Sequence, residues 1–152
     1  MSNSHKEILS WCFDSIIEFN EIGGNVAGNV DPQLEAKMLR EEIKEYFDAA
    51  MEDNHKEVMD GLADTMVVLV GTIHKHNLWN KFPEILAAVC TSNMSKFCDT
   101  LDDAKLTIEH YKDNFDIEAH YEFNEKHNKY VIKNKQGKIL KSIYFRKPVL
   151  DA

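Results

Sequence analysis

Residues 54–76 constrain the fold most, because they describe a capped helix whose side chains are apolar almost all round. Asn54 followed by Glu57 is typical of a capping box, and basic side chains near His76 suit a helix C-terminus. Between these ends the apolar residues are Leu62, Ala63, Met66, Val67, Val68, Leu69, Val70 and Ile73. A helix without a polar face is a central, buried helix, so we expect the chain to pack around it.

Further helices are predicted from end signals on both sides of this one. A capping box at Ser4 starts a helix over 4–20, and the Asp31-Pro32 pair starts another that runs to about residue 51. Its predicted apolar face is formed by Leu39, Ile43, Tyr46, Phe47 and Ala50. Two more helices are expected over 80–97 and 100–111.

The C-terminal third changes character. Segments 129–133 and 138–145 are rich in Tyr, Val and Ile, and they flank a glycine-containing turn at 134–137, which predicts a small β-hairpin. With 152 residues, we expect one domain. The predicted fold is mainly α: a bundle of four to five helices over about 4–112, with a C-terminal hairpin extension over about 119–152.

Composition excludes two classes of partner. Lys and Arg number 18 against 26 Asp and Glu, a formal charge of −8, which disfavours binding to a nucleic-acid backbone or to a membrane surface. The apolar run 66–70 is too short to span a bilayer. The three cysteines form no C-x-x-C pair, which favours reduced thiols in the cytoplasm. A protein this acidic that handles phosphates needs a bound divalent cation to neutralise them.

The second predicted helix carries closely spaced glutamates. Glu41, Glu42 and Glu45 are three or four residues apart and so sit on neighbouring turns. At about 100° per residue, Glu42 and Glu45 share the stripe of Leu34, Met38 and Ala49 rather than lying opposite the core. Two glutamates with this spacing ordinarily belong to a solvated helix face. Glu42 and Glu45 are unusual in that respect, because they share their stripe with apolar residues.

The third predicted helix adds a second acidic stripe. Glu57, Asp60 and Asp64 follow an i, i+3, i+7 spacing, and Gly71 continues the stripe where a backbone or ligand can approach. Asp64 stands within the apolar part of the helix, where a charged carboxylate needs a partner: a base, a proton or a metal ion. No basic residue lies three or four positions away. Carboxylates converging from two helices suit Mg²⁺, or Mn²⁺, better than Zn²⁺.

These acidic motifs resemble a known enzyme family. The runs 39–45 and 60–68, with Gly71-Thr72, are similar to the all-α nucleoside triphosphate pyrophosphohydrolases, the MazG-like and phosphoribosyl-ATP pyrophosphohydrolase-like proteins. Their signature is E-x-x-E on one helix and E/D-x-x-D on the next. Residues 92–96 resemble the family's S-N-M-S-K segment, and residues 137–148 its G-K-x-x-K…Y…P segment.

One position departs from the family pattern. Many relatives place a glutamate three residues before the aspartate that corresponds to Asp64, and here that position is Gly61. The acids available on this helix are instead Glu57, Asp60 and Asp64. Which of Glu57 and Asp60 reaches a metal is left open.

The resemblance implies a hydrolase that cleaves a nucleoside triphosphate between its α and β phosphates, with Mg²⁺ or Mn²⁺ as cofactor. It implies metal ligands among Glu42, Glu45, Glu57, Asp60 and Asp64. Glu41 or Glu42 is expected to act as the base. The substrate contacts expected from the resemblance are Asn93, Lys96, Lys138 and Lys141.

The resemblance also implies a homodimer or homotetramer with sites near the interface. Two alternatives remain. One is a non-catalytic helical dimer whose acidic patch binds a structural cation or a basic partner, and the other is a dedicated phosphoribosyl-ATP pyrophosphohydrolase.

Overall fold

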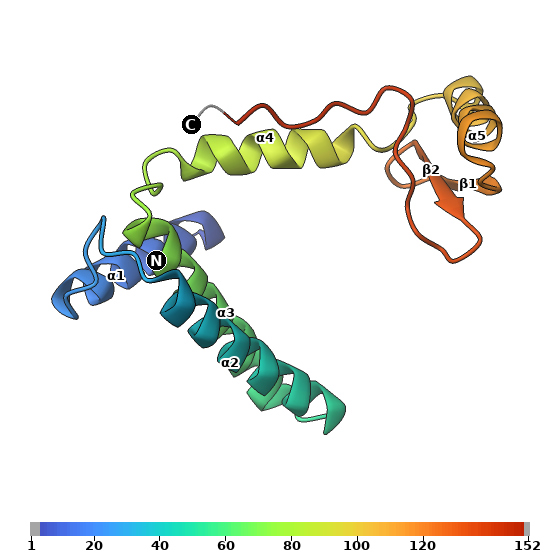
Figure 1. Ribbon diagram of the computed structural model, residues 1–152. Coiled ribbons are helices and arrows are strands. Elements are labelled where there is room, and N and C mark those ends of the chain that lie inside the picture. The colour runs from blue at the N-terminus through green and yellow to red at the C-terminus, as the bar shows by residue number, and fades with distance from the viewer. Residues whose placement is uncertain (1–3, 151–152) are drawn as a thin grey trace. The chain divides into compact units, whose positions relative to one another are not determined.

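A computed structural model describes residues 4–150, and these residues contain five helices and one two-stranded antiparallel sheet (Figure 1). The predicted mainly α fold with a small C-terminal hairpin is confirmed. The chain divides into two compact units, Met1–Phe82 and Pro83–Ala152. No helix within the described residues is long and apolar enough to cross a membrane.

The N-terminal unit consists of three helices whose ends follow the predicted caps. They are α1 (His5–Ile22), α2 (Pro32–Met51) and α3 (His55–Lys75). The Ser4 side chain and Glu7 form the reciprocal capping box of α1. The Asp31 side chain accepts from two amides at the start of α2, and the Asn54 side chain accepts from the amide of Glu57. Each cap satisfies backbone N–H groups that have no partner within the helix.

Two glycines of α3 allow close packing in this unit. A Cβ atom at Gly61 would lie 2.9 Å from the backbone nitrogen of Tyr46, so the backbones of α2 and α3 meet there. A Cβ atom at Gly71 would lie 2.9 Å from the side-chain amide of Asn20 on α1. The close approach expected at Gly71 is therefore made by a side chain of this protein. Figure 1 shows α2 and α3 running side by side.

A buried ionic cluster joins the start of α2 to the end of α3. The Glu35 carboxylate is 2.9 Å from Lys75 Nζ and 3.0 Å from His76 Nε2, and it also accepts from the amide of Asp31. Glu35 and Lys75 are both buried. Burial raises the pKa of Glu35, but the hydrogen bonds from Lys75, His76 and the Asp31 amide outweigh it, so this pKa lies below its ordinary value. The cluster holds a charged carboxylate inside the unit.

The prediction that α3 is buried all round is wrong. Leu62, Met66 and Leu69 are 52%, 48% and 40% exposed. Asp64 is exposed as well, so its predicted burial is also wrong. The reason is that α1 and α2 cover only part of the helix surface, and nothing in this unit covers the remainder.

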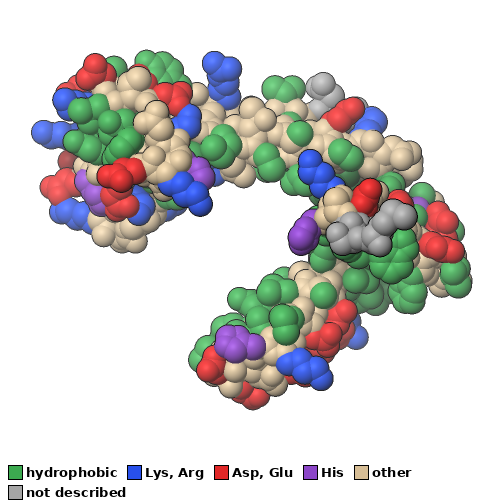
Figure 2. Space-filling model, turned by 180° about the vertical axis from the view of Figure 1, so that it is seen from behind, with side chains coloured by type: hydrophobic (Ala, Val, Ile, Leu, Met, Phe, Trp, Pro, Cys, Tyr) green, Lys and Arg blue, Asp and Glu red, His purple; other side chains and the backbone are tan. Residues whose placement is uncertain are grey.

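The predicted apolar face of α2 likewise does not form a core. Ile43 and Phe47 are 52% and 57% exposed, while Leu39 and Tyr46 are half-buried. The side of α2 that packs against α3 instead buries Glu35 and Ala49. Figure 2 shows hydrophobic side chains on the surface of one face of this unit. The unit thus leaves two apolar helix faces open to solvent.

The C-terminal unit packs a helix against a hairpin. Its elements are α4 (Phe82–Met94, which begins at the division), α5 (Leu101–Phe115), β1 (Ala119–Asn124) and β2 (Lys129–Asn134). Its core consists of Cys98, Ala104, Ile132 and Leu140, against which Ile108, Tyr111, Ile117, Ala119 and Tyr130 pack. The helix α4 ends three residues before the predicted bound, and α5 continues four residues beyond it.

The first strand of the predicted hairpin is correct, but its predicted partner is wrong. Strand β2 pairs with β1, from Ala119↔Asn134 to Asn124↔Lys129. The predicted partner, 138–145, forms only an isolated bridge between Lys133 and Ile139. The turn at 134–137 exists, with Gly137 at φ 79°. The segment that follows it does not pair with β2 along its length, because its backbone amides bond to α5 and to Ser95 and Lys96, which follow α4.

This segment, residues 141–148, is called the strap below. Its amides donate four hydrogen bonds of 3.0–3.3 Å to the rest of the unit: Lys141 to the Tyr111 hydroxyl, Ser142 to the Lys96 carbonyl, Ile143 to Thr107 Oγ1, and Arg146 to Ser95 Oγ. The strap therefore lies beside the S-N-M-S-K segment, although about fifty residues separate them in sequence.

Candidate acidic site

The acidic stripes of α2 and α3 converge around Glu42. Its side chain is half-buried, and its pKa is raised, first because burial disfavours the charged form and then because other carboxylates surround it. Those carboxylates are Glu45, Asp64, Glu41 and Asp60. The structure thus gathers five of the predicted site residues into one cluster of like charge.

An adjoining cleft extends this cluster along the two helices. It has a volume of about 290 Å³ and is lined by Glu45, Asp48, Ala49, Glu52, Asn54, Glu57, Asp60 and Gly61. Glu57 and Asp60 therefore both face the cleft, together with Glu45. The sequence prediction missed Asp48 and Glu52, although their spacing of three and seven residues from Glu45 is the helical pattern that identified the other acids.

The helix packing explains the departure at position 61. Gly61 lies against the backbone of Tyr46, which follows Glu45 directly. A glutamate at this position would have its Cβ atom within 2.9 Å of that backbone, so this packing has no room for it. The missing side chain brings α2 and α3 together, and Asp60 and Asp64 then flank the contact.

The cluster lacks neutralising partners. Glu41 lies 3.6 Å from Lys37 on the solvent side, and Lys44 pairs with Asp48. Within residues 4–150, no Lys, Arg or His forms an ion pair with Glu42, Glu45, Asp60 or Asp64. Like charges that are held together in this way repel, and a bound cation would relieve that repulsion.

The donor set fits a hard divalent cation, because every available ligand atom is a carboxylate oxygen. Over the part of the chain that the structure describes, however, no three His, Cys, Asp or Glu side chains are close enough to hold a metal ion together. The acids form a concentrated negative field, and rotation of exposed side chains would be needed to bring their oxygens to one point.

The predicted substrate contacts lie in the C-terminal unit and do not form one group. Lys96 Nζ donates to Asn93 Oδ1 over 2.8 Å, so these two side chains are together. Lys141 lies over the ring of Phe145, 4.4 Å from its centroid. Lys138 is exposed beside the turn.

The family comparison agrees with the acidic motifs. The phosphoribosyl-ATP pyrophosphohydrolase family matches residues 27–93. That range holds α2, α3 and the acidic cluster, and it confirms the resemblance predicted from the sequence. No curated protein and no solved structure matches the chain.

Proposed function

We propose that this protein is a Mg²⁺-dependent pyrophosphohydrolase that cleaves a nucleoside triphosphate between its α and β phosphates, giving a nucleoside monophosphate and pyrophosphate. The family match supports a pyrophosphohydrolase-type function. The observation that carries the proposal is the cluster around Glu42, whose pKa is raised by burial and by four other carboxylates drawn from two helices. Structural proteins have little reason to concentrate unpaired acids at a helix contact.

The residues that would hold the metal are Glu42, Glu45, Asp60 and Asp64, with Glu57 reaching it from the adjoining cleft. A bound Mg²⁺, or Mn²⁺, offsets the charge of the phosphate oxygens and stabilises the charge that develops on them during hydrolysis. The acids alone would repel a triphosphate, which is why the proposal requires the cation.

A glutamate of α2 is the proposed general base. Glu41 or Glu42 would accept a proton from the attacking water. Glu42 is the more shielded of the two and already has a raised pKa. Glu41 is exposed and lies near Lys37, so it is the base if Glu42 serves the metal.

Substrate contacts are proposed at Asn93, Lys96, Lys138 and Lys141. The hydrogen bond from Lys96 to Asn93 fixes the position of one ammonium group, and the ring of Phe145 fixes that of Lys141. Cations held in this way suit contacts with phosphate or sugar oxygens.

We also propose a homodimer or homotetramer that resides in the cytoplasm. The open apolar faces of α2 and α3 support association, because soluble monomers rarely expose large contiguous apolar patches. Cys12, Cys90 and Cys98 are free thiols, which suits a reducing compartment.

The test is pyrophosphate release from each ribo- and deoxyribonucleoside triphosphate in the presence of Mg²⁺. We expect turnover with at least one of them, and its loss in Glu45→Gln and Asp64→Asn while helical content is kept. Asp14→Asn, an exposed acid of α1, is the matched control and should retain activity. Absence of turnover with every nucleotide would overturn the proposal and favour the non-catalytic dimer.

Phosphoribosyl-ATP is included because it is the substrate named by the matching family. Turnover of phosphoribosyl-ATP alone would identify the narrower enzyme, whereas turnover of simple triphosphates supports the broader one.

A further inference from the structure

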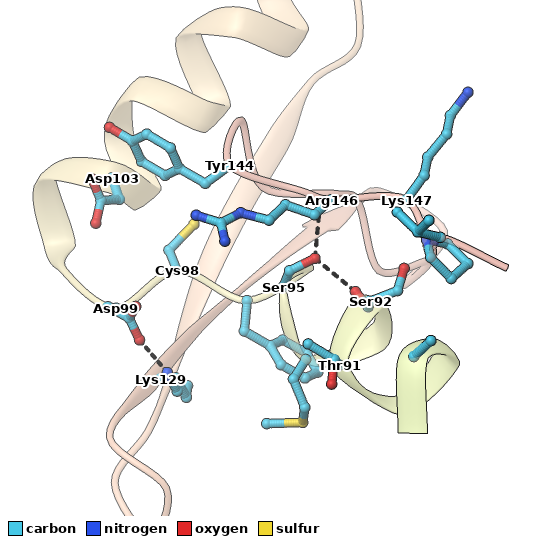
Figure 3. Close-up of a pocket in the computed structure, with 15 residues that line it drawn as sticks. Thr91, Ser92, Ser95, Cys98, Asp99, Asp103, Lys129, Tyr144, Arg146 and Lys147 are labelled. Atoms are coloured by element: carbon cyan, nitrogen blue, oxygen red, sulfur yellow. Dashed lines mark hydrogen bonds and ion pairs between the residues drawn. The ribbon is translucent and has the colours of Figure 1, made fainter. Parts of the chain in front are cut away.

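One edge of the two-stranded sheet is covered by another segment of the C-terminal unit. The backbone of Tyr130 on β2 exchanges two hydrogen bonds with Cys98, of 2.9 and 3.0 Å. Figure 3 shows the side chain of Lys129, one residue earlier, paired with Asp99. Cys98 and Asp99 belong to the connection between α4 and α5, so this connection protects the outer edge of β2 from pairing with other strands.

These bonds determine which backbone groups of β1 point outward. Successive residues of a strand direct their N–H and C=O groups to opposite edges. Tyr130 bonds to Cys98, and the Ile132 carbonyl accepts from the Leu140 amide over 2.8 Å, so the alternate residues of β2 bond to β1. These alternate residues are Lys129, Val131 and Lys133, and their partners on β1 are Asn124, Glu122 and His120. The outward N–H and C=O groups of β1 therefore belong to Ala119, Tyr121 and Phe123.

The outer edge of β1 is open within the C-terminal unit. In residues 83–150, no backbone group forms a hydrogen bond with the outward N–H and C=O groups of Tyr121 and Phe123. The side chains of these two residues are 41% and 46% exposed. A row of unpaired N–H and C=O groups is a template for another strand, so this edge is suited to pairing with one.

The charges of β1 make it complementary to a second copy of itself. His120 Nε2 lies 3.5 Å from Glu122 Oε1, so the two side chains share one face of the strand. When outward residues face each other, only two antiparallel registers pair five residues of each strand. One of them places Glu122 opposite Glu122 of the second copy, and such a like-charge contact opposes pairing. The other places Tyr121 opposite Tyr121 and His120 opposite Glu122, on both sides of a twofold axis.

We propose that two copies of this protein pair through β1, antiparallel about a twofold axis at Tyr121, and so form a continuous four-stranded sheet. His120 of each copy then lies opposite Glu122 of the other, and Ala119 lies opposite Phe123. The outward groups exchange about six hydrogen bonds, and four strands are more stable than an isolated pair. This interface is separate from the apolar faces of α2 and α3 and from the proposed hydrolysis. A chain that uses both interfaces assembles into a tetramer.

Cysteine cross-linking of the full chain tests the register. The background carries Cys12→Ser and Cys90→Ser, and the third cysteine is buried. Tyr121→Cys should form a disulfide-linked dimer on mild oxidation, because the Cα atoms of a hydrogen-bonded pair lie about 5.5 Å apart, within disulfide range. Phe123→Cys is the matched control and should not form the link, because its two Cα atoms would lie about 14 Å apart across the axis. Combining Phe123→Cys with Ala119→Cys should restore the link, because these positions face each other.

Sedimentation velocity tests the interface without a cross-link. The full chain carries Ile43→Glu, so that the apolar helix faces do not contribute, and we expect a dimer. Tyr121→Pro removes the outward N–H group at the axis while the bonds to β2 stay intact, and His120→Glu places like charges opposite each other. Each should weaken the dimer about tenfold or more. His120→Lys keeps opposite charges in contact and should retain it, and thermal unfolding checks that each variant is folded.

Three results would overturn the proposal. A monomeric Ile43→Glu chain at 100 times the protein concentration of about 1 μM used for hydrodynamic work shows that the edge stays in water or takes a strand of another protein. Equal cross-linking at Tyr121→Cys and Phe123→Cys shows that the copies do not meet in this register. Equal association of His120→Glu and His120→Lys shows that the charges of β1 do not select the partner.

Discussion

Glu42 is the residue at which the proposed function has a measurable thermodynamic consequence. Its pKa is raised in the folded protein, so the folded state binds its proton more tightly than the unfolded state does. Folding stability therefore falls as the pH rises from the ordinary glutamate range through the raised pKa, and it stays lower above it. In the metal-free protein, the charged form of Glu42 therefore lowers folding stability.

We predict that Glu42→Gln stabilises the metal-free protein at neutral pH, by about 0.2–0.5 kcal/mol, because the repulsion from its acidic neighbours is removed. The gain should shrink as the pH falls below the ordinary pKa. Urea unfolding in EDTA between pH 4 and 8 measures it. Glu18→Gln, an exposed acid of α1, should show no such trend, and a variant less stable than wild type at neutral pH contradicts the interpretation of Glu42.

The sequence predicted some residues of the acidic cluster correctly but missed contacts between distant residues and the exposure of Asp64, for a physical reason. Helical spacing found Glu42, Glu45, Asp60 and Asp64, because neighbours on a helix face are fixed by the local repeat. The bond from Glu35 to Lys75 joins positions 40 residues apart, and no local pattern reveals it. The exposure of Asp64 was missed because the burial of a side chain depends on what packs against its helix. An apolar sequence does not show whether the same chain or another molecule covers that helix.

At the scale of elements, Gly61 determines how closely α2 and α3 approach, and hence how far apart their acids lie. We predict that Gly61→Ala destabilises the protein by about 1–3 kcal/mol, because the added Cβ atom would meet the Tyr46 backbone at 2.9 Å and must push the helices apart. Thermal unfolding measures this loss. The Gly61→Ala substitution should also reduce the affinity for Mg²⁺, because it moves the carboxylates of α2 and α3 apart.

A matched control is available on the same helix. Ala63→Gly lies at an exposed position of α3 and reports only helix propensity, about 1 kcal/mol in favour of alanine. Alanine at position 61 should therefore raise helix propensity and yet lower stability. A net gain in stability at position 61 would show that the helices have room to spare, and the steric account of the contact would be wrong.

Elements whose signals are local were predicted well, and those that depend on distant partners were not. Side-chain caps fixed the starts of α1, α2 and α3, since the cap and the amides that it satisfies are at most three residues apart. The turn at 134–137 was also found, but the partner of β2 was not. Pairing with β1 places the ring of Phe123 against that of Tyr130, with centroids 4.7 Å apart. The competing segment instead donates hydrogen bonds to Tyr111 and Thr107 of α5.

At the scale of the whole molecule, the exposed apolar faces of α2 and α3 favour association with a partner. We propose that this partner is a second copy of the chain. Ile43, Phe47 and Met51 lie four residues apart along α2 and are 52%, 57% and 72% exposed. A stripe with this spacing forms a continuous ridge that can pack against another helix. Exposed Leu62 and Met66 on α3 add to the same kind of surface.

We predict that the wild-type chain sediments as a dimer or tetramer at micromolar concentration and that Ile43→Glu weakens this association more than tenfold, because it places a charge in a desolvated helix contact. Sedimentation velocity over a concentration series measures the effect. Gln33→Glu adds the same charge at an exposed polar position of α2 and should leave the association unchanged. A monomeric wild type would mean that these faces stay in water or bind a different partner. The acidic cluster would then have to function within a single chain, in which the contact at Gly61 and the buried pair of Glu35 and Lys75 are two of the links between α2 and α3.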